Sequence, residues 1–218
     1  MHGLGRAYAS TVGKKYAMAV TGVILFLFVV LHMLGNLQVF LGRDALNGYA
    51  RLLRVEPALL WTARLVLLAA VTVHVVAAVQ LTLRNWAARP VGYAKQQYLA
   101  TGYAARTMVW SGPIIAAFVV YHLLHLSIGT MHPDFVDGDV YHNVVVGFSV
   151  WYVTTFYMLA QVLLGLHLYH GLFSLFQSLG ASHPSYDRWR QPLALAAAAV
   201  IVLGSCSIPA AVLVGGVR

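Results

Sequence analysis

Five long apolar stretches dominate the pattern of hydrophobic and polar positions along the chain. They cover residues 16–40, 61–83, 107–130, 147–177 and 192–214, and shorter segments between them collect most of the charged residues. A helix needs about 20 consecutive, mostly apolar residues to cross the hydrocarbon core of a membrane. Each stretch meets this length, so the sequence predicts an all-α integral membrane bundle of five transmembrane helices.

The segments between the apolar stretches carry turn signals. Asn47-Gly48, Arg89-Pro90, His132-Pro133 and His183-Pro184 each fall in a different connector. Such dipeptides typically end helices or form loops. The sequence contains no internal repeat and no linker, so residues 1–218 are expected to form a single transmembrane domain. The first apolar run is longer than the core of a signal peptide and lacks a clear cleavage site, which favours a retained first helix.

The composition supports the same interpretation. Apolar residues make up 60% of the chain and charged residues only 9%, whereas a soluble domain carries about 25% charged residues. The single cysteine, Cys206, lies in an apolar run. A disulfide framework and a thiolate metal cluster are therefore not expected.

The formal net charge of +8 is distributed unevenly. If the N-terminus is cytoplasmic, the inner segments hold one acid, Asp187, and nine basic residues: Arg6, Lys14, Lys15, Arg84, Arg89, Lys95, Arg106, Arg188 and Arg190. The outer segments hold a balanced set: Arg43, Arg51, Arg54, Arg64 and Arg218 against Asp44, Glu56, Asp134, Asp137 and Asp139. Cytoplasmic loops are enriched in Lys and Arg, so this distribution predicts a cytoplasmic N-terminus. It favours anionic lipid and a docked cytoplasmic partner, and no nucleic acid.

The middle of each predicted span lacks Asp, Glu, Lys and Arg. Ion pumps and proton-coupled transporters usually place such groups within the membrane. Matching Gly/Pro interruptions, which mark many inverted-repeat transporters, are also missing from the sequence. Transport is therefore a less favoured function.

Four of the five spans contain a histidine well inside the apolar stretch, namely His32, His74, His122 and His167. An intramembrane histidine either hydrogen-bonds across helices as a packing residue or has a functional role. Because successive spans alternate in direction, a rise of about 1.5 Å per residue places His32 and His122 at one depth and His74 and His167 at another. Two imidazoles at one depth on facing helices suit the two axial positions of a b-type haem. The sequence therefore predicts two stacked haem sites.

Spacing alone leaves alternative ligands open. His125 follows His122 by three residues and His170 follows His167 by three, so each pair shares roughly one helix face. A non-haem metal site is less favoured because no carboxylate accompanies the histidines. His2, His132, His142 and His183 lie in polar ends or loops and are expected to be surface residues.

Other residues are candidates for contacts with the porphyrin. Gly171, one turn after His167, could make room for the edge of the ring. Propionates need donors near the membrane surface: Lys15, Arg84, Arg106 and Gln177 could serve an inner haem, and Arg43 or Arg64 an outer one. Anchoring at the membrane interface is an equally good role for these residues.

The strings around the histidines resemble the di-haem cytochrome b membrane subunit of bacterial succinate dehydrogenase and fumarate reductase. The resemblance spans most of the chain and includes GKKYAMAVTGVILFLFVVLHMLGNLQVFLGRDALNGYARLLR, WTARLVLLAAVTVHVVAAVQLTLRNWAARPVGY, SGPIIAAFVVYHLLHLSIG and LGLHLYHGLFSLFQSLG. It implies that His32 pairs with His122 on an outer haem and His74 with His167 on an inner one. His125 and His170 match family positions that are not ligands.

The resemblance also implies partners and a reaction. A flavoprotein with FAD and an iron–sulfur subunit would dock on the cytoplasmic face of a bacterial inner membrane. Electrons from succinate would reach a membrane quinone, menaquinone rather than ubiquinone, and this chain would hold no succinate site. The quinone-site residues stay unknown: Glu56, Trp61 and Arg64 at the outer face and a pocket at the inner face are equally compatible with the sequence. The alternative function is a free-standing transmembrane di-haem reductase of the cytochrome b561 type.

Overall fold

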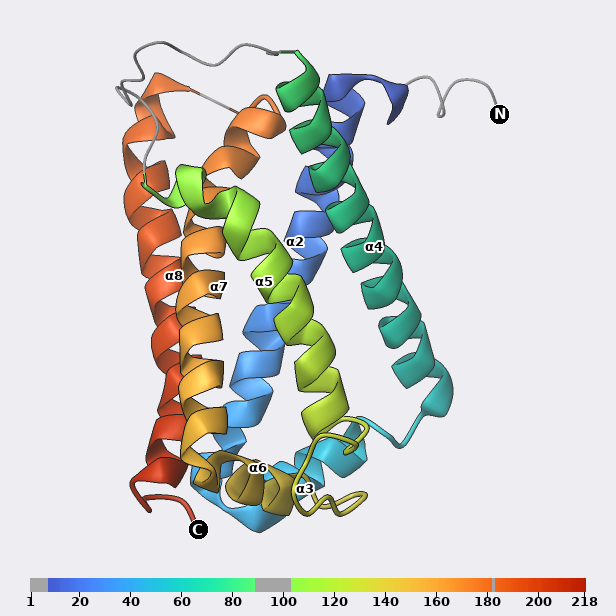
Figure 1. The fold of residues 1–218 in the computed structure, drawn as a ribbon, viewed down its shortest axis with the longest axis vertical. Helices are drawn as coiled ribbons and strands as arrows, with labels where there is room; N and C mark the ends of the chain where they lie inside the picture. Colours follow the sequence, from blue (N-terminus) through green and yellow to red (C-terminus); the bar gives the residue numbers. More distant parts are fainter. Residues whose placement is uncertain (1–7, 89–102, 182) are drawn as a thin grey trace.

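A computed structural model describes residues 8–88, 103–181 and 183–218 of the chain, and the described part is helical with no strand. Five long helices form the bundle in Figure 1: α2 (Thr11–Asn36), α4 (Pro57–Ala87), α5 (Tyr103–Leu126), α7 (Trp151–Ser178) and α8 (Pro184–Leu213). Each contains a segment long and apolar enough to cross a membrane. The predicted all-α bundle of five membrane helices is confirmed, and the chain is a multi-pass membrane protein. Arg6, Arg89, Lys95 and His2, which the sequence placed in polar segments, lie outside the described residues.

At least one end of every predicted span was wrong by four residues or more, most of all the start of the last span. The last helix begins at Pro184, well before residue 192, and Pro192 lies inside it. Membrane helices tolerate an internal proline because neighbouring groups satisfy the freed backbone. The side chain of His183 caps the start of α8 by accepting a hydrogen bond from the backbone N–H of Ser185. The third helix, α5, begins at Tyr103 and ends at Leu126, four residues before each predicted end.

Two short helices were missed, α3 (Arg43–Leu52) and α6 (Val140–Ser149). Figure 1 shows both lying across one end of the bundle, the end opposite to the start of α2. The Asn47-Gly48 pair, expected in a loop, lies inside α3, and the predicted span 147–177 contains a break at Val150 between α6 and α7. A short helix at a membrane boundary has mixed polarity, so a search for apolar stretches does not detect it.

Asp139 ties α3 to α6. Its carboxylate accepts hydrogen bonds at 2.8 Å from both Arg43 and Asn47, and at 3.1 Å from the backbone N–H of His142. Asn47 in turn accepts from the backbone N–H of Tyr141 at 3.0 Å. The hydrogen bond from Asn47 is the largest influence holding the pKa of Asp139 below its usual value, with smaller contributions from His142 N–H and Arg43, and burial opposes them. This network fixes the two short helices across the end of the bundle.

The long helices do not all pack against one another. Close packing, with Cα atoms within 8 Å, is extensive between α7 and α8, between α2 and α4, and between α5 and α7. A glycine allows one of these contacts: Gly165 of α7 faces Val202 of α8, and a Cβ at Gly165 would come within 2.3 Å of Cγ2 of Val202. Among the described residues, α4 has no comparable packing against α5 or α7, nor α2 against α5.

Candidate functional site

The four histidines predicted inside the membrane form two facing pairs. The ring centroids of His32 on α2 and His122 on α5 are 5.7 Å apart, with the ring planes at 90°. The ring centroids of His74 on α4 and His167 on α7 are 6.3 Å apart, with an interplanar angle of 57°. These are the two pairs expected from matched depths. Each joins two helices that do not pack closely against each other.

The spacing within each pair can be compared with that of two imidazoles on one metal ion. Imidazole nitrogens bond to transition-metal ions at about 2.0 Å, so two rings on opposite sides of one ion have centroids about 6 Å apart. The observed separations are 5.7 Å and 6.3 Å. The residues present therefore fit bis-histidine ligation of a b-type haem at both levels.

The ring of His74 is held in one orientation by the backbone and a side chain of α2. Its Nδ1 lies 3.1 Å from the backbone oxygen of Met18 and 3.1 Å from Oγ1 of Thr21. A carbonyl oxygen only accepts, so Nδ1 must carry the proton. In a neutral imidazole the other nitrogen, Nε2, then has a free lone pair. A histidine that ligates a metal usually makes this kind of bond through its second nitrogen.

The opposite members of the two pairs argue against a role as packing residues only. Nδ1 of His122 and Nδ1 of His167 are buried and have no hydrogen-bond partner in the described part of the chain. Buried polar atoms are nearly always paired, and each exception requires an explanation. Nε2 of His125 is also buried without a partner, but that ring bonds through Nδ1 to the Tyr157 hydroxyl, whereas neither His122 nor His167 makes a hydrogen bond among the described residues.

Aromatic rings surround the His32–His122 pair. His32 stacks on Phe28 with centroids 5.2 Å apart. His122 lies 6.0 Å from the ring of Phe118 and 5.9 Å from the ring of Tyr157, centroid to centroid. This pair is therefore positioned by ring packing, whereas His74 is positioned by hydrogen bonds.

His125, the alternative to His122, is engaged elsewhere. It is 0% exposed, and its Nδ1 lies 2.9 Å from the hydroxyl of Tyr157. Its ring stacks on Tyr121 and lies 5.0 Å from the ring of His132. The geometry therefore favours His122 as the partner of His32. In the same way His167, and not His170, faces His74.

His132 and His142, which were expected to be surface residues, are only partly exposed and are bonded to neighbouring segments. His132 is half-buried, and its Nε2 donates to the backbone oxygen of Asn143 at 2.8 Å. His142 is half-buried and contacts the Asp134 carboxylate at 3.1 Å. Both histidines hold the connector between α5 and α6 in place, which no local sequence signal indicates.

The residues proposed to contact a porphyrin lie in different surroundings. Gly171 lies on α7, and a Cβ added there would meet no atom within 4 Å, so space adjoins this position. Lys15 is exposed near the start of α2, and Arg106, near the start of α5, lies over the ring of Tyr103 at 5.7 Å. Arg84 instead donates to the backbone oxygen of Ala9 at 2.8 Å and so ties α4 to the start of α2.

The remaining candidates lie at helix ends as the sequence suggested. Gln177 is exposed near the end of α7. Arg64 of α4 lies over the ring of Trp61 at 5.0 Å, at the opposite end of the bundle. Both positions agree with anchoring at the membrane interface as well as with contacts to a propionate.

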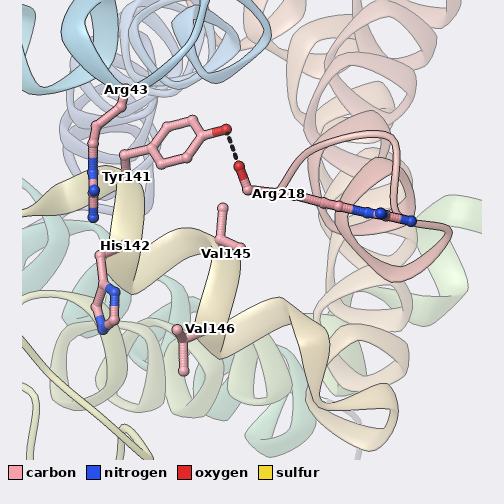
Figure 2. Close-up of a pocket in the computed structure, with 6 residues that line it drawn as sticks. All are labelled: Arg43, Tyr141, His142, Val145, Val146 and Arg218. Atoms are coloured by element: carbon pink, nitrogen blue, oxygen red, sulfur yellow. Dashed lines mark hydrogen bonds between the residues drawn. The ribbon is translucent and has the colours of Figure 1, made fainter.

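A pocket of about 400 Å³ lies away from all four histidines, at the end of the bundle that carries α3 and α6. Figure 2 shows its lining residues: Arg43, Tyr141, His142, Val145, Val146 and Arg218. The hydroxyl of Tyr141 donates to the backbone oxygen of Arg218 at 2.9 Å. Two of the basic side chains already have carboxylate partners, Arg43 with Asp139 and His142 with Asp134. Arg218 is the third basic residue of the lining.

Comparison with models of known families, with curated proteins and with solved structures gives no match to this chain.

Proposed function

We propose that this chain is the membrane-anchor cytochrome b subunit of a succinate:quinone oxidoreductase and binds two b haems. The observation that supports this most directly is the pair of facing imidazoles at each of two levels, His32 with His122 and His74 with His167, at centroid separations of 5.7 Å and 6.3 Å. Each pair would hold one iron.

The contribution of the chain's own residues follows from this ligation. Each pair would hold a haem iron through two imidazoles and leave no open position on it, which would favour electron transfer over oxygen binding. Apolar helices around the site exclude water and tune the reduction potential. When bound, the haems supply one-electron carriers between a cytoplasmic partner and a membrane quinone.

The proposed partner subunits would dock at one end of the bundle. Basic residues gather at the end of the bundle where α2 begins, among them Lys15, Arg106 and Arg188. They suit docking of the iron–sulfur subunit, which carries the flavoprotein, on the cytoplasmic face of a bacterial inner membrane. The proposed quinone is menaquinone. The enzyme activity belongs to the complex, because the succinate site lies in the flavoprotein.

The haem proposal is tested on the purified chain. A dithionite-reduced spectrum is expected to show an α-band, and a pyridine haemochrome assay is expected to give two haems per chain. Ferric samples should give low-spin electron paramagnetic resonance signals, as expected when two imidazoles ligate each iron. A preparation from haem-supplied cells without an α-band would overturn the proposal.

The complex is tested by gentle purification from membranes. We expect the chain to co-purify with a flavoprotein and an iron–sulfur protein and to show succinate-dependent reduction of menaquinone. A chain that is isolated alone and catalyses electron transfer across the membrane would support the cytochrome b561-type function instead.

A further inference from the structure

The structure assigns to Thr21 a positioning role toward the inner haem ligand His74: its hydroxyl oxygen, together with the backbone oxygen of Met18, accepts from the Nδ1–H of the ring and so lowers the reduction potential of that haem. This inference rests on the proposed function. It comes from the single place where a described side chain hydrogen-bonds to one of the four facing histidines.

The Thr21 hydroxyl donates one hydrogen bond and accepts another. Its hydroxyl is 2.7 Å from the backbone oxygen of Ala17, 3.2 Å from that of Met18 and 3.1 Å from Nδ1 of His74. A hydroxyl has one hydrogen, and both carbonyls only accept. The hydroxyl donates this hydrogen to the backbone oxygen of Ala17, which is the nearest acceptor. The Thr21 oxygen is therefore an acceptor toward Nδ1 of His74.

His74 therefore has two acceptors on the same nitrogen. Met18 supplies a backbone oxygen at 3.1 Å and Thr21 a hydroxyl oxygen at 3.1 Å. The neighbouring Gly22 lies against the ring, since a Cβ there would be 3.5 Å from Cε1 of His74. The ring is thus held against one turn of α2 with its Nδ1–H directed at that turn.

This arrangement should change the electronic character of the ligand. Acceptors on the second nitrogen of an imidazole raise its basicity toward the metal. A more basic ligand stabilises the ferric iron more than the ferrous iron, so the potential falls. The other three histidines have no comparable hydrogen bond from a side chain in the described residues. Only one of the two haems should respond when Thr21 is changed.

Two substitutions isolate the hydroxyl. Thr21→Val keeps the size of this buried side chain and removes the acceptor, while Thr21→Ser keeps the hydroxyl. Thr72→Val is the matched control: Thr72 lies on α4 two residues from His74, is exposed, and bonds only to its own helix through the oxygen of Leu68 at 2.7 Å.

The test is a spectroelectrochemical redox titration of the whole complex, with ferric electron paramagnetic resonance spectra of the same samples. In Thr21→Val we expect one haem to titrate at higher potential. At the potential where it is half reduced in the wild type, its reduced-to-oxidised ratio should rise roughly two- to tenfold, as expected for loss of one hydrogen bond. Its ferric signal should move, and Thr21→Ser and Thr72→Val should match the wild type.

Other results contradict the inference in different ways. If Thr21→Val binds two haems with unchanged potentials and spectra, the positioning role is wrong and the proposed function stands. If Thr21→Ser shifts the potential as much as Thr21→Val, the hydroxyl is not responsible. A wild-type chain that binds no haem would overturn the proposed function and this inference together.

Discussion

The imidazoles of His74 and His167 face each other from α4 and α7, two helices whose backbones do not pack closely, with ring centroids 6.3 Å apart. Only side chains therefore link these helices at this level. A ligand held between the rings would add an interaction that the apolar surfaces of the two helices do not provide. The same relationship holds for His32 and His122.

The pairing predicts which haem each variant loses. His74→Ala and His167→Ala should each abolish the same spectral component, because either change removes one of two ligands from one iron. His32→Ala and His122→Ala should abolish the other component. Each variant should retain about one of the two haems, measured by pyridine haemochrome assay and low-temperature spectra. His170→Ala, one turn from His167, is the control and should retain both; loss of one component by His74→Ala and His122→Ala alike would contradict the pairing.

Substitutions at Gly171 test whether the edge of a porphyrin lies beside α7. Residues four apart lie on the same helix face, and a Cβ at Gly171 would meet no atom within 4 Å. Gly171→Leu should therefore leave the helix bundle folded but fill space beside His167, reducing the haem content by about one per chain. Gly171→Ala, which adds only one methyl group, is the graded control. Two haems at wild-type content in Gly171→Leu would show that the porphyrin edge lies elsewhere.

Tyr157 and His125 provide a test of structure separate from ligation. The Tyr157 hydroxyl contacts Nδ1 of His125 at 2.9 Å, and His125 is 0% exposed. Tyr157→Phe leaves that nitrogen buried without a partner, which typically costs about 1–3 kcal/mol. We expect a lower Tm in detergent, measured by circular dichroism, with both haems retained. Tyr152→Phe is the control because Tyr152, on the same helix, is 62% exposed; equal stability of the two variants would remove the structural role of this contact.

The sequence predicted the parts of the molecule that depend on apolar length and on depth. The five spans and the two histidine pairs follow from counting residues, since a helix rises about 1.5 Å per residue. The short helices α3 and α6 did not follow, because α3 is polar and α6 is too short to cross a membrane and overlaps the predicted stretch 147–177 only at its end. The contact of Thr21 with His74 joins residues 53 positions apart and depends on the rotation of α2 against α4. No local pattern reports such a rotation.

The network at Asp139 predicts how stability depends on pH. Its pKa in the folded chain lies below the ordinary value of 3.8, chiefly because Asn47 donates a hydrogen bond to the carboxylate. A carboxyl group with a depressed folded-state pKa stabilises the fold above its unfolded pKa. That contribution is lost as the pH falls through the folded-state pKa, when the protonated group releases Asn47 and Arg43. The Tm should therefore fall on acidification below about pH 4.

Asn47→Ala should reduce this acid sensitivity, because it removes the largest cause of the shift in the Asp139 pKa. The Tm of the variant should be lower than that of the wild type at neutral pH, since the backbone N–H of Tyr141 also loses its acceptor. The difference in Tm between the two proteins should then narrow as the pH falls below about 4, measured by thermal unfolding in detergent. Asn85→Ala, an exposed change near the end of α4, should follow the wild-type profile. A difference that stays constant across this range would mean that Asn47 stabilises α3 and α6 without acting through the charge of Asp139.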